Sequence, residues 1–516
     1  MWLPWTKYRR PPRDKVTPRL LWHRSLEGNL KSIREELGHP YDLVIREFQL
    51  GSGQTRPAAA AWINGLADEA AIDQHILRPL MFEAGNAAGP GELADHALSL
   101  GGLETTGDLR QVATALLAGV TVILVHGAAR AYLASTPGWP TRALAEPPSE
   151  VALRGPRQGF VEDIRVNTTL LRRYLRTPDL RLDSMTIGQR TRTPVIIAYI
   201  AGVVNPRIVE EVKARLGRIQ IDGILSDNYL EELIRDAPYS PFPTIGNTER
   251  PDVVAAGLLE GQVAIFTDGS PFVLRVPTLF LQFFQTPEDY YLNYQVATLG
   301  RWLRLAGLTV ALTLPSIYVA VTTFHPEMIP PQLLITIAAA REGVPFPMVI
   351  EALIMEFAFE ALREAGLRMP RALGQAMSIV GALILGQAAI DAGIVSAPTV
   401  VIVAGTAIAS FLLTHPDIVA VSRLIRFPLL LLAGTLGLLG VMAGLILMHL
   451  HMLSLRSFGV PYLSPLAPLN LSQARDTLAL WPLWSKTARP DMFTWQKSRR
   501  QAPGNRPGPP KKRRRI

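Results

Sequence analysis

The chain has 516 residues, a mean hydropathy of +0.19 and only 18% charged residues, against about 25% in typical soluble domains. This composition argues against an ordinary soluble protein and indicates that part of the chain lies in a membrane. Cysteine is absent, which excludes disulfide scaffolds, thiolate metal sites and cysteine nucleophiles. The net charge of +9 is carried by residues 497–516, so it does not indicate nucleic-acid binding.

The first half of the chain contains an internal repeat. Residues 56–80 superpose on 193–216 at an offset of 137, and residues 116–127 superpose on 258–269 at an offset of 142. Two matches in the same order with nearly equal offsets indicate a duplicated α/β unit.

We expect each copy to contain a mixed sheet with helices, in which Asp68 or Asn205 caps a helix. A Pro-rich stretch at 136–150 separates the copies. The predicted fold class is a duplicated cytoplasmic α/β domain followed by an α-helical polytopic membrane domain. The predicted regions are a poorly ordered N-terminus (1–25), α/β subdomain 1 (26–150), α/β subdomain 2 (151–300), the membrane domain (301–455), a juxtamembrane segment (456–496) and a disordered basic tail (497–516).

No catalytic motif occurs in the sequence. There is no GxxxxGK[ST], HExxH or GxSxG pattern, and Asp268–Pro271 is typical of a turn that closes a hairpin. Glu249–Asp252 favours a structural ion pair or a domain contact, and His449 and His451 favour interfacial positions over a metal pair. The sequence therefore predicts no enzyme, no cofactor and no metal site.

Charge-free runs locate the predicted membrane segments. They cover residues 305–326, 372–390, 392–416 and 427–455, and a helix needs ~20 mainly apolar residues to cross ~30 Å of hydrocarbon. Together with an acidic segment between them, these runs predict four to six membrane segments. No apolar run precedes residue 305, so we expect no N-terminal signal peptide and a cytoplasmic α/β half.

The acidic segment, residues 345–366, combines helix propensity with carboxylates. Glu356, Glu360 and Glu364 fall within ~80° of one another on a helical wheel. One interpretation is an amphipathic helix in the headgroup plane with solvated acids. The other is a spanning helix whose acids face a water-filled lumen shared between subunits, because ionised groups inside membranes usually mark ion pathways.

The placement of arginines assigns a direction to most segments. Those within 301–304, 363–371 and 423–426 indicate the cytoplasmic side. The run at 427–453 then leaves the following residues outside, although the tail is strongly basic. Either this run forms a re-entrant pair with 457–470, or another segment does not cross. The tail itself is either a contact with anionic lipid headgroups or a solvated end.

Several stretches resemble the A subunit of the GerA family of spore-germinant receptors in both order and spacing. The resemblance covers about residues 40–485. Its clearest stretches are DLVIREF (42–48), GPRQGFVEDIRVN (155–167), IDGILSDNYLEELI (221–234), SPFPTIGNTERPD (240–252), LLEGQVAIFTDGSPFVL (258–274), PEDYY (287–291), TFHPEMIP (323–330), AAAREGVPFP (338–347), EFAFEALREAGLRMP (356–370), GQAMSIVGALILGQAAIDAGIVS (374–396), RLIRFPLLLL (423–432) and LRSFGVPYLSPLAPL (455–469).

The resemblance implies a non-enzymatic sensor subunit in the inner membrane of a dormant bacterial spore, with several membrane passes and a cytoplasmic N-terminal domain. The implied partners are a transporter-like B subunit that binds the nutrient, a lipoprotein C subunit, membrane lipid and further copies of the chain. The implied activity is that of a nutrient-gated channel for monovalent cations that triggers germination. No nucleic-acid partner is expected.

The resemblance also favours the second interpretation of the acidic segment, because an oligomeric cation channel requires a ring of negative or polar groups. The candidate pore-lining residues are Glu356, Glu360 and Glu364. The candidate coupling element is the AREGVPFP stretch, whose glycine and prolines interrupt helices where a gate would bend; a fixed structural turn is the alternative. Its residues are Arg341, Glu342, Gly343, Pro345 and Pro347.

Two other functions stay open on the sequence. A secondary transporter usually shows duplicated membrane halves, whereas the repeat here lies in the α/β half. A non-conducting membrane scaffold, or a regulatory paralogue within the family, is not separated from a channel subunit by any motif.

Overall fold

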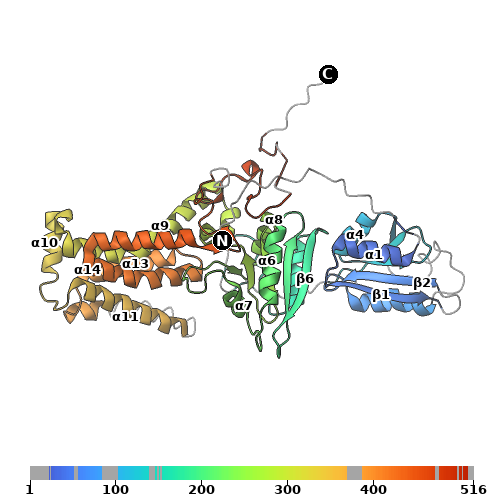
Figure 1. The fold of residues 1–516 in the computed structure, drawn as a ribbon, viewed down its shortest axis with the longest axis horizontal. Helices are drawn as coiled ribbons and strands as arrows, with labels where there is room; N and C mark the ends of the chain where they lie inside the picture. The colour runs from blue at the N-terminus through green and yellow to red at the C-terminus, as the bar shows by residue number, and fades with distance from the viewer. Residues whose placement is uncertain are drawn as a thin grey trace, which may run out of the picture. The chain divides into compact units, whose positions relative to one another are not determined.

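We describe the chain from a computed structural model (Figure 1). The residues that it describes are 22–23, 25–51, 56–83, 103–138, 146–147, 150, 154–368, 386–470, 476–496, 499–502 and 504–508. Most of the N-terminal 1–25 region, the Pro-rich stretch, the 372–390 run and the basic tail lie outside these residues. The predictions of disorder at the two ends and of a membrane segment at 372–390 therefore stay predictions.

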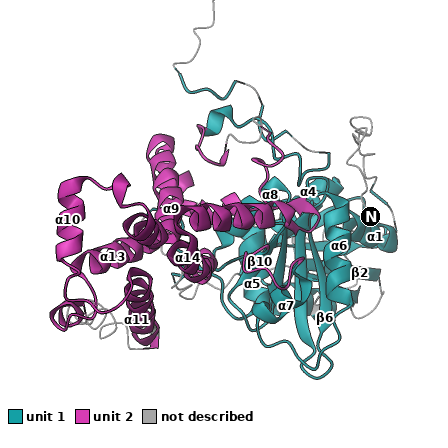
Figure 2. Cartoon of the chain, turned by 60° about the vertical axis from the view of Figure 1, so that its left-hand side comes forward, with its two compact units in different colours: residues 1–235, 245–278, 483–516 teal, residues 236–244, 279–482 magenta. Residues whose placement is uncertain are grey.

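The chain forms two compact units (Figure 2). The α/β unit contains residues 1–235, 245–278 and 483–516, and the helical unit contains residues 236–244 and 279–482. The residues that follow the helical unit therefore belong to the α/β unit. The predicted regions 456–496 and 497–516 did not include this return to the α/β unit.

The first copy of the repeat is a five-stranded sheet with the strand order β1-β2-β4-β5-β3. Alternate residues of its strands are buried on both faces, against α1 and α4 on one side and α2 with its continuation on the other. The strands are β1 (Leu43–Leu50), β2 (Arg56–Ile63), β3 (Leu103–Thr106), β4 (Val120–Val125) and β5 (Ala131–Ser135), and the helices are α1 (Leu26–Leu37), α2 (Glu69–Ile72), η1 (Asp73–Leu77), η2 (Pro79–Glu83) and α4 (Leu109–Leu117).

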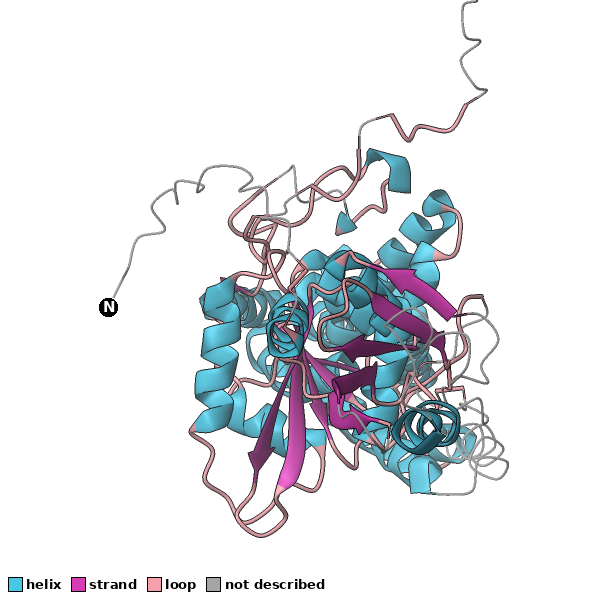
Figure 3. Cartoon of the chain, turned by 90° about the vertical axis from the view of Figure 1, so that its right-hand side faces the viewer, coloured by secondary structure: helices cyan, strands magenta, loops and turns pink. Residues whose placement is uncertain are grey.

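The second copy has the same strand order, β6-β7-β9-β10-β8. Its α5 and α8 pack on the sheet face that corresponds to the α1–α4 face of the first copy. The strands, magenta in Figure 3, are β6 (Leu180–Ile187), β7 (Thr193–Ile200), β8 (Gly246–Thr248), β9 (Val263–Thr267) and β10 (Val273–Val276), and the helices are α5 (Ile164–Tyr174), α6 (Pro206–Gly217), α7 (Asp227–Ile234) and α8 (Pro251–Glu260).

The duplication and both predicted caps are confirmed. The Asp68 side chain accepts from the backbone N–H groups of Ala70 and Ala71, and Asn205 accepts from that of Arg207. The expectation of mixed sheets is wrong for the described strands, because every ladder in both sheets is antiparallel. Strand-like alternation predicts that a segment is a strand but says nothing about its direction.

Two short sequence elements have the predicted structural roles. The turn at Asp268–Pro271 joins the antiparallel strands β9 and β10, with Gly269 in the left-handed region at φ 84°. The buried Arg250 side chain pairs with Asp252 at 2.9 Å and also donates to the carbonyl oxygens of Glu150 and Pro156. Arg250 therefore fixes the start of α8 rather than contributing to a site.

The helical unit contains long apolar helices, some of which run antiparallel to one another. Two of them, α9 and α14, are long and apolar enough to cross a membrane by length and composition. A Cβ atom on Gly307 in α9 would lie 3.0 Å from the carbonyl oxygen of Ala409, while Gly405 faces Leu314, so α13 runs antiparallel to α9. The helices are α9 (Tyr294–Phe324), α10 (Pro331–Ala339), α11 (Met348–Arg368), α13 (Ala397–Phe411) and α14 (Pro416–Ser454), with the 3₁₀ turns η3 (Phe280–Phe284), η4 (Pro287–Tyr290) and η5 (Pro326–Met328). The 3₁₀ turn η7 (Leu483–Ser485) follows the helical unit and belongs to the α/β unit.

The 39 residues of α14 form a hairpin of two antiparallel helices. Gly437 has non-helical angles (φ 61°, ψ −142°), and the residues beyond it fold back on those before it. A Cβ atom on Gly444 would lie 2.6 Å from Leu429, and Gly440 faces the carbonyl of Leu432. In a straight helix residues fifteen positions apart are ~22 Å apart.

The hairpin bears on the topological conflict in the sequence. The charge-free run at 427–453 contains a turn at Gly437, so it forms two antiparallel helices instead of one straight helix. Ile418 near the beginning of α14 and Met452 near its end belong to the same hydrophobic cluster. The hairpin thus lies inside this run, and the predicted re-entrant pair of 427–453 with 457–470 stays a prediction.

A buried ion pair joins the two copies of the repeat within the α/β unit. Arg172 of α5 and Asp42, which precedes β1, are almost fully buried, and Arg172 Nη2 donates to Asp42 Oδ1 at 2.8 Å. Beside it, the hydroxyl groups of Tyr41 and Thr168 are hydrogen-bonded at 2.5 Å, and burial raises the pKa of Tyr41 to about 12.

The Arg172–Asp42 pair gives a first prediction. Arg172→Leu leaves the Asp42 carboxylate buried without a counter-charge, so the free energy of unfolding of the α/β unit should fall by about 3–5 kcal/mol. Urea denaturation of the full chain in detergent measures it. Arg46→Leu, which removes the exposed Arg46–Asp73 pair, is the matched control and should cost at most about 1 kcal/mol. Equal effects of the two variants would contradict the assignment.

Candidate functional site

The candidate site is a set of buried charges in the helical unit, and its centre is a pair between α11 and α14. Glu356 is 3% exposed and Arg426 is 4% exposed. Glu356 Oε2 accepts from Arg426 Nη1 at 2.6 Å, and Arg426 Nε donates to the carbonyl oxygen of Ala311 in α9 at 2.8 Å. One charged pair therefore fastens three helices together.

The other two predicted pore-lining acids differ from Glu356 in exposure. Glu360 is partly exposed and forms an ion pair with Arg423, one turn before Arg426. Glu364 is more than half exposed, and within the described part of the chain its one ion pair is with Arg368 on its own helix at 2.6 Å. Within one chain, α14 thus neutralises the first two acids, and only the last has its carboxylate largely accessible.

A second buried carboxylate, Glu351, lies one and a half turns earlier on α11 and is fully buried. Arg341 donates to its Oε1 atom at 3.0 Å. Its Oε2 atom accepts from the Ser396 backbone N–H at 3.0 Å, from the Ser396 hydroxyl at 2.8 Å and from the Thr399 hydroxyl at 3.2 Å. The carboxylate therefore ties the turn before α11 to the beginning of α13.

The predicted coupling residues lie in this turn. Arg341, Glu342 and Gly343 follow α10, and Pro345 and Pro347 precede α11. The backbone carbonyl of Pro347 accepts from the N–H groups of Ile350 and Glu351, which fixes the first turn of α11. The arginine brings this stretch onto Glu351, whereas the other four residues have no contact with that carboxylate among the described interactions. A role in gating stays a prediction.

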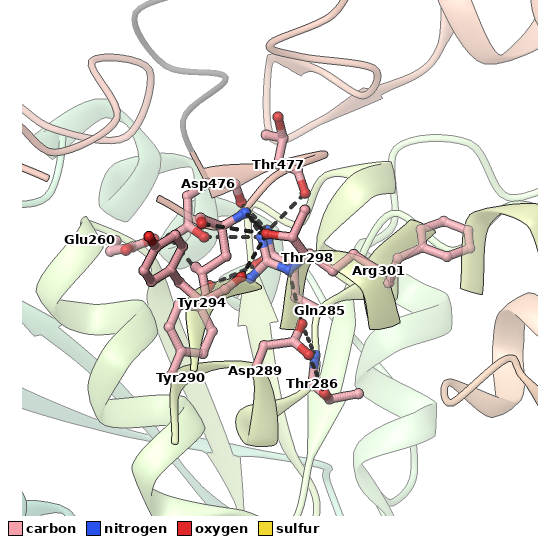
Figure 4. A network of polar contacts seen from close by, with 12 residues as sticks. Glu260, Gln285, Thr286, Asp289, Tyr290, Tyr294, Thr298, Arg301, Asp476 and Thr477 are labelled. Atoms are coloured by element: carbon pink, nitrogen blue, oxygen red, sulfur yellow. Dashed lines mark hydrogen bonds and ion pairs between the residues drawn. The ribbon is translucent and has the colours of Figure 1, made fainter. Parts of the chain in front are cut away.

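A third cluster surrounds Asp289, at the beginning of α9 (Figure 4). Arg301 Nε donates to Asp289 Oδ2 at 2.9 Å, and Arg301 Nη1 donates to Asp476 Oδ1 at 3.0 Å and to its carbonyl at 2.8 Å. Arg304 binds the same Asp289 carboxylate, and Thr286 donates to it at 3.0 Å. Of the two arginines that the sequence assigned to the cytoplasmic flank, Arg301 thus fastens residues 476–477 to α9, and Arg304 holds Asp289.

The Asp289 carboxylate is held in its ionised form. Burial alone would raise its pKa, but the hydrogen bonds and positive charges of Arg304 and Arg301 outweigh burial and lower the pKa below the ordinary 3.8. The Tyr290 ring lies 5.5 Å from the guanidinium carbon of Arg301, which adds a cation–π contact.

The histidines of the last apolar run have structural contacts. His451 Nε2 is hydrogen-bonded to the Ser240 hydroxyl at 2.8 Å, and His449 Nδ1 lies 2.7 Å from the Leu445 carbonyl oxygen. Among the described residues, no group of three His, Asp or Glu side chains is arranged to hold a metal ion.

The sequence pointed to most of the carboxylates of these clusters but not to the residues that bind them. Glu351 lies in the acidic segment. The spacing of Ser396 and Thr399 indicates only the beginning of a helix, and no sequence pattern around Asp476 indicates an ion pair. The arginines at 423 and 426 were assigned to a flank, although their spacing of three places both on one face of a helix. That spacing, set beside Glu356 and Glu360 on α11, is the signal that would have suggested the pairing.

The Glu356–Arg426 pair gives a second prediction. Glu356→Gln leaves Arg426 buried without its carboxylate, so the free energy of unfolding of the helical unit should fall by about 3–5 kcal/mol. Thermal unfolding of the detergent-purified full chain measures the change. Glu364→Gln, which removes an exposed pair on the same helix, should cost at most about 1 kcal/mol. The assignment fails if Glu356→Gln unfolds at the temperature of the unmodified chain.

The Asp289 cluster gives a third prediction, for pH. Because the folded-state pKa of Asp289 lies below its ordinary value of 3.8, its stabilising contribution is present above 3.8 and is lost as the pH falls through the lower folded-state value. Asp289→Asn should therefore lower stability at neutral pH and make the loss on acidification smaller. Unfolding midpoints of both chains between neutral and acid pH test this, with Asp73→Asn as the exposed control. Parallel pH curves would contradict it.

The comparisons with known proteins agree with one another. A family model described as "Bacillus/Clostridium GerA spore germination protein" matches residues 31–492. Spore germination protein KA of Bacillus subtilis (strain 168) is 44% identical over 487 residues, which is 94% of this chain and 90% of that protein. The uncharacterized membrane protein YfkQ of the same organism is 42% identical over 471 residues, 91% of each chain.

A solved structure also matches. The N-terminal domain of the A subunit of the Bacillus megaterium spore germinant receptor GerK3 is 33% identical, with a TM-score of 0.39, and the match covers 52% of this chain and 99% of that one. The family model extends over both the α/β and the helical unit, as does the match to protein KA. The chain therefore belongs to the GerA family of spore germination proteins.

Proposed function

We propose that this chain is the A subunit of a nutrient receptor in the inner membrane of a bacterial spore, and that its copies assemble into a nutrient-gated channel for monovalent cations. It works with a transporter-like B subunit and a lipoprotein C subunit, and the α/β unit lies in the cytoplasm. Opening of the channel would commit the spore to germination. Family membership supports the role in germination.

The observation that carries the membrane part of the proposal is the inverted distribution of polarity in the helical unit. Its arginine and glutamate side chains at 301, 351, 356 and 426 are at most 4% exposed. Large apolar side chains such as Leu439 and Phe411 are more than 70% exposed. A water-soluble helical unit buries apolar side chains and exposes charges, whereas lipid favours this reverse arrangement.

The helix directions support a polytopic arrangement. The part of α14 before Gly437 runs parallel to α9. Glu356 and Glu360 of α11 pair with Arg426 and Arg423 of α14 in reverse order, so α11 runs antiparallel to both helices. If α9 leads away from the cytoplasm, α11 therefore returns to it. The helix α13 also returns, and α14 enters and comes back. The passes are then α9, α11, the predicted segment at 372–390, α13 and the two halves of α14. Their number is even and lies within the four to six that we predicted.

The gating proposal rests on bistability. A nutrient bound to the partner shifts the channel only if it favours the open state through different contacts. Glu356 Oε1 and Arg426 Nη2 are buried polar atoms without a hydrogen-bond partner among the described residues. Because these two atoms lack partners in the present arrangement, a second arrangement of α11 against α14 costs little additional free energy. The Arg341–Glu351 contact would move with α11.

A non-conducting scaffold is the second candidate, and one observation favours it. In a single chain, α14 already neutralises Glu356 and Glu360, which leaves Glu364 as the acid most available to a lumen. The two candidates therefore differ most clearly at this residue. A secondary transporter has less support, since the duplication lies in the α/β unit.

The fourth prediction tests the channel at this residue. Glu364→Gln should lower nutrient-dependent K⁺ efflux several-fold in a reconstituted receptor, because it removes one negative charge per subunit from the ring. Glu35→Gln, which removes the exposed acid of the Lys31–Glu35 pair on α1, is the matched control and should leave efflux unchanged. Unchanged efflux with the Glu364→Gln variant would show that this acid does not line the pore. Absence of efflux from the unmodified receptor would favour the non-conducting scaffold.

A further inference from the structure

The duplicated α/β unit contains the same backbone contact twice, just after the second strand of each copy. In the first copy, Asp68 N–H donates to the carbonyl of Thr136 at 2.9 Å, and Gly138 N–H donates to that of Leu66 at 3.0 Å. These bonds flank an antiparallel bridge between Ala67 and Pro137.

The second copy reproduces these bonds at the offset of the repeat, with different partners. Asn205 N–H donates to the carbonyl of Phe493 at 2.9 Å, and Trp495 N–H donates to that of Val203 at 2.9 Å. The bridge that they flank is antiparallel and joins Val204 to Thr494. Residues 203–205 are the counterparts of 66–68 at an offset of 137.

The two contacts differ in the origin of the closing segment. In the first copy, residues 136–138 follow directly on β5. In the second copy, the corresponding strand β10 ends at Val276, and the chain leaves for the helical unit at residue 279. The position that residues 136–138 occupy in the first copy is taken in the second copy by residues 493–495. These residues come more than 200 residues later in the chain, after the helical unit.

The returning segment is packed like an integral part of the copy. Phe493 is 1% exposed. Gly261 has a left-handed φ of 98°, and a Cβ atom there would lie 2.8 Å from the Phe493 carbonyl oxygen, so a side chain would displace the segment. Arg500 pairs with Glu260 at 3.0 Å, and Arg489 donates to the Leu259 carbonyl. All of these contacts lie within the α/β unit, teal in Figure 2.

We infer that the second α/β subdomain carries a docking site for an extended peptide, and that its occupant is residues 493–495 of the same chain. The site is made by the backbone of residues 203–205, the beginning of α6 and the Gly261 end of α8. Because occupancy keeps these residues on the α/β unit, the segment lies on the same side of the membrane as that unit. The number of crossings between residues 279 and 482 is then even.

The absence of native cysteine allows a direct test by paired cysteines in the full chain. At both bridges the flanking hydrogen bonds define a non-hydrogen-bonded antiparallel pair, in which Cα atoms lie ~4.5 Å apart, within the ~4.4–6.8 Å of disulfides. Val204→Cys with Thr494→Cys tests the inference. Ala67→Cys with Pro137→Cys is the matched control in the first copy.

Both pairs should form an intramolecular disulfide when membranes containing the full chain are mildly oxidised, which protects both thiols from alkylation. The inference is overturned if the control pair becomes protected and the 204–494 pair stays fully alkylated. It is also overturned if the 204–494 pair gives a disulfide-linked dimer, because the occupant would then be a second copy.

A further variant separates docking from accidental proximity. Trp495→Pro removes the N–H group that donates to Val203. Added to the 204–494 pair, it should lower the disulfide yield several-fold. Added to the 67–137 pair, it should leave the yield unchanged, which shows that the chain still folds. An unchanged yield in the 204–494 pair would mean that the two hydrogen bonds do not hold the segment.

Discussion

A charge inside a helical unit with an apolar exterior persists only when an opposite charge satisfies it, and the arrangement of helices here follows from that constraint. The Glu356–Arg426 pair joins α11, α14 and α9, and Glu351 joins the turn before α11 to the beginning of α13. A well-packed apolar substitute for a buried pair is often as stable. The pairs therefore specify which helices are neighbours more than they add to overall stability. The same property makes them candidates for contacts that change when the helices move.

The Asp289 cluster applies the same chemistry at the beginning of α9. Arg301 is shared between Asp289, which precedes the helix, and Asp476, which follows the hairpin by more than twenty residues. Asp476 is thus fixed to the first helix of the unit. The hydrogen bonds and positive charges of Arg304 and Arg301 lower the pKa of Asp289, which favours its ionised form in the pair with Arg301.

Sequence reasoning predicted the parts of this protein that repeat or follow a period, and missed the parts that depend on distant contacts. Nearly equal offsets revealed the duplication and both caps at Asp68 and Asn205, because the two copies share the same local sequence pattern. They did not reveal strand direction, and the sheets are antiparallel. The turn at Gly437 escaped notice because 434, 440 and 444 are also glycines in the same apolar run. The acids of α11 were found from their spacing, whereas their arginine partners were assigned to a flank, since charge placement along a chain does not show which charges meet.

The hairpin and the docked segment reach one conclusion from different parts of the molecule. Gly437 returns the chain to the end of the helical unit at which α14 began, since Ile418 and Met452 share a cluster. The bridge between Val204 and Thr494 places the later residues on the α/β unit without reference to any helix. A single pass through 427–453 would satisfy neither observation, because it would leave residue 454 at the opposite end from residue 416. The basic tail that conflicted with a single pass then follows a segment attached to the α/β unit. Our proposal places that unit in the cytoplasm, the side that lysine and arginine favour.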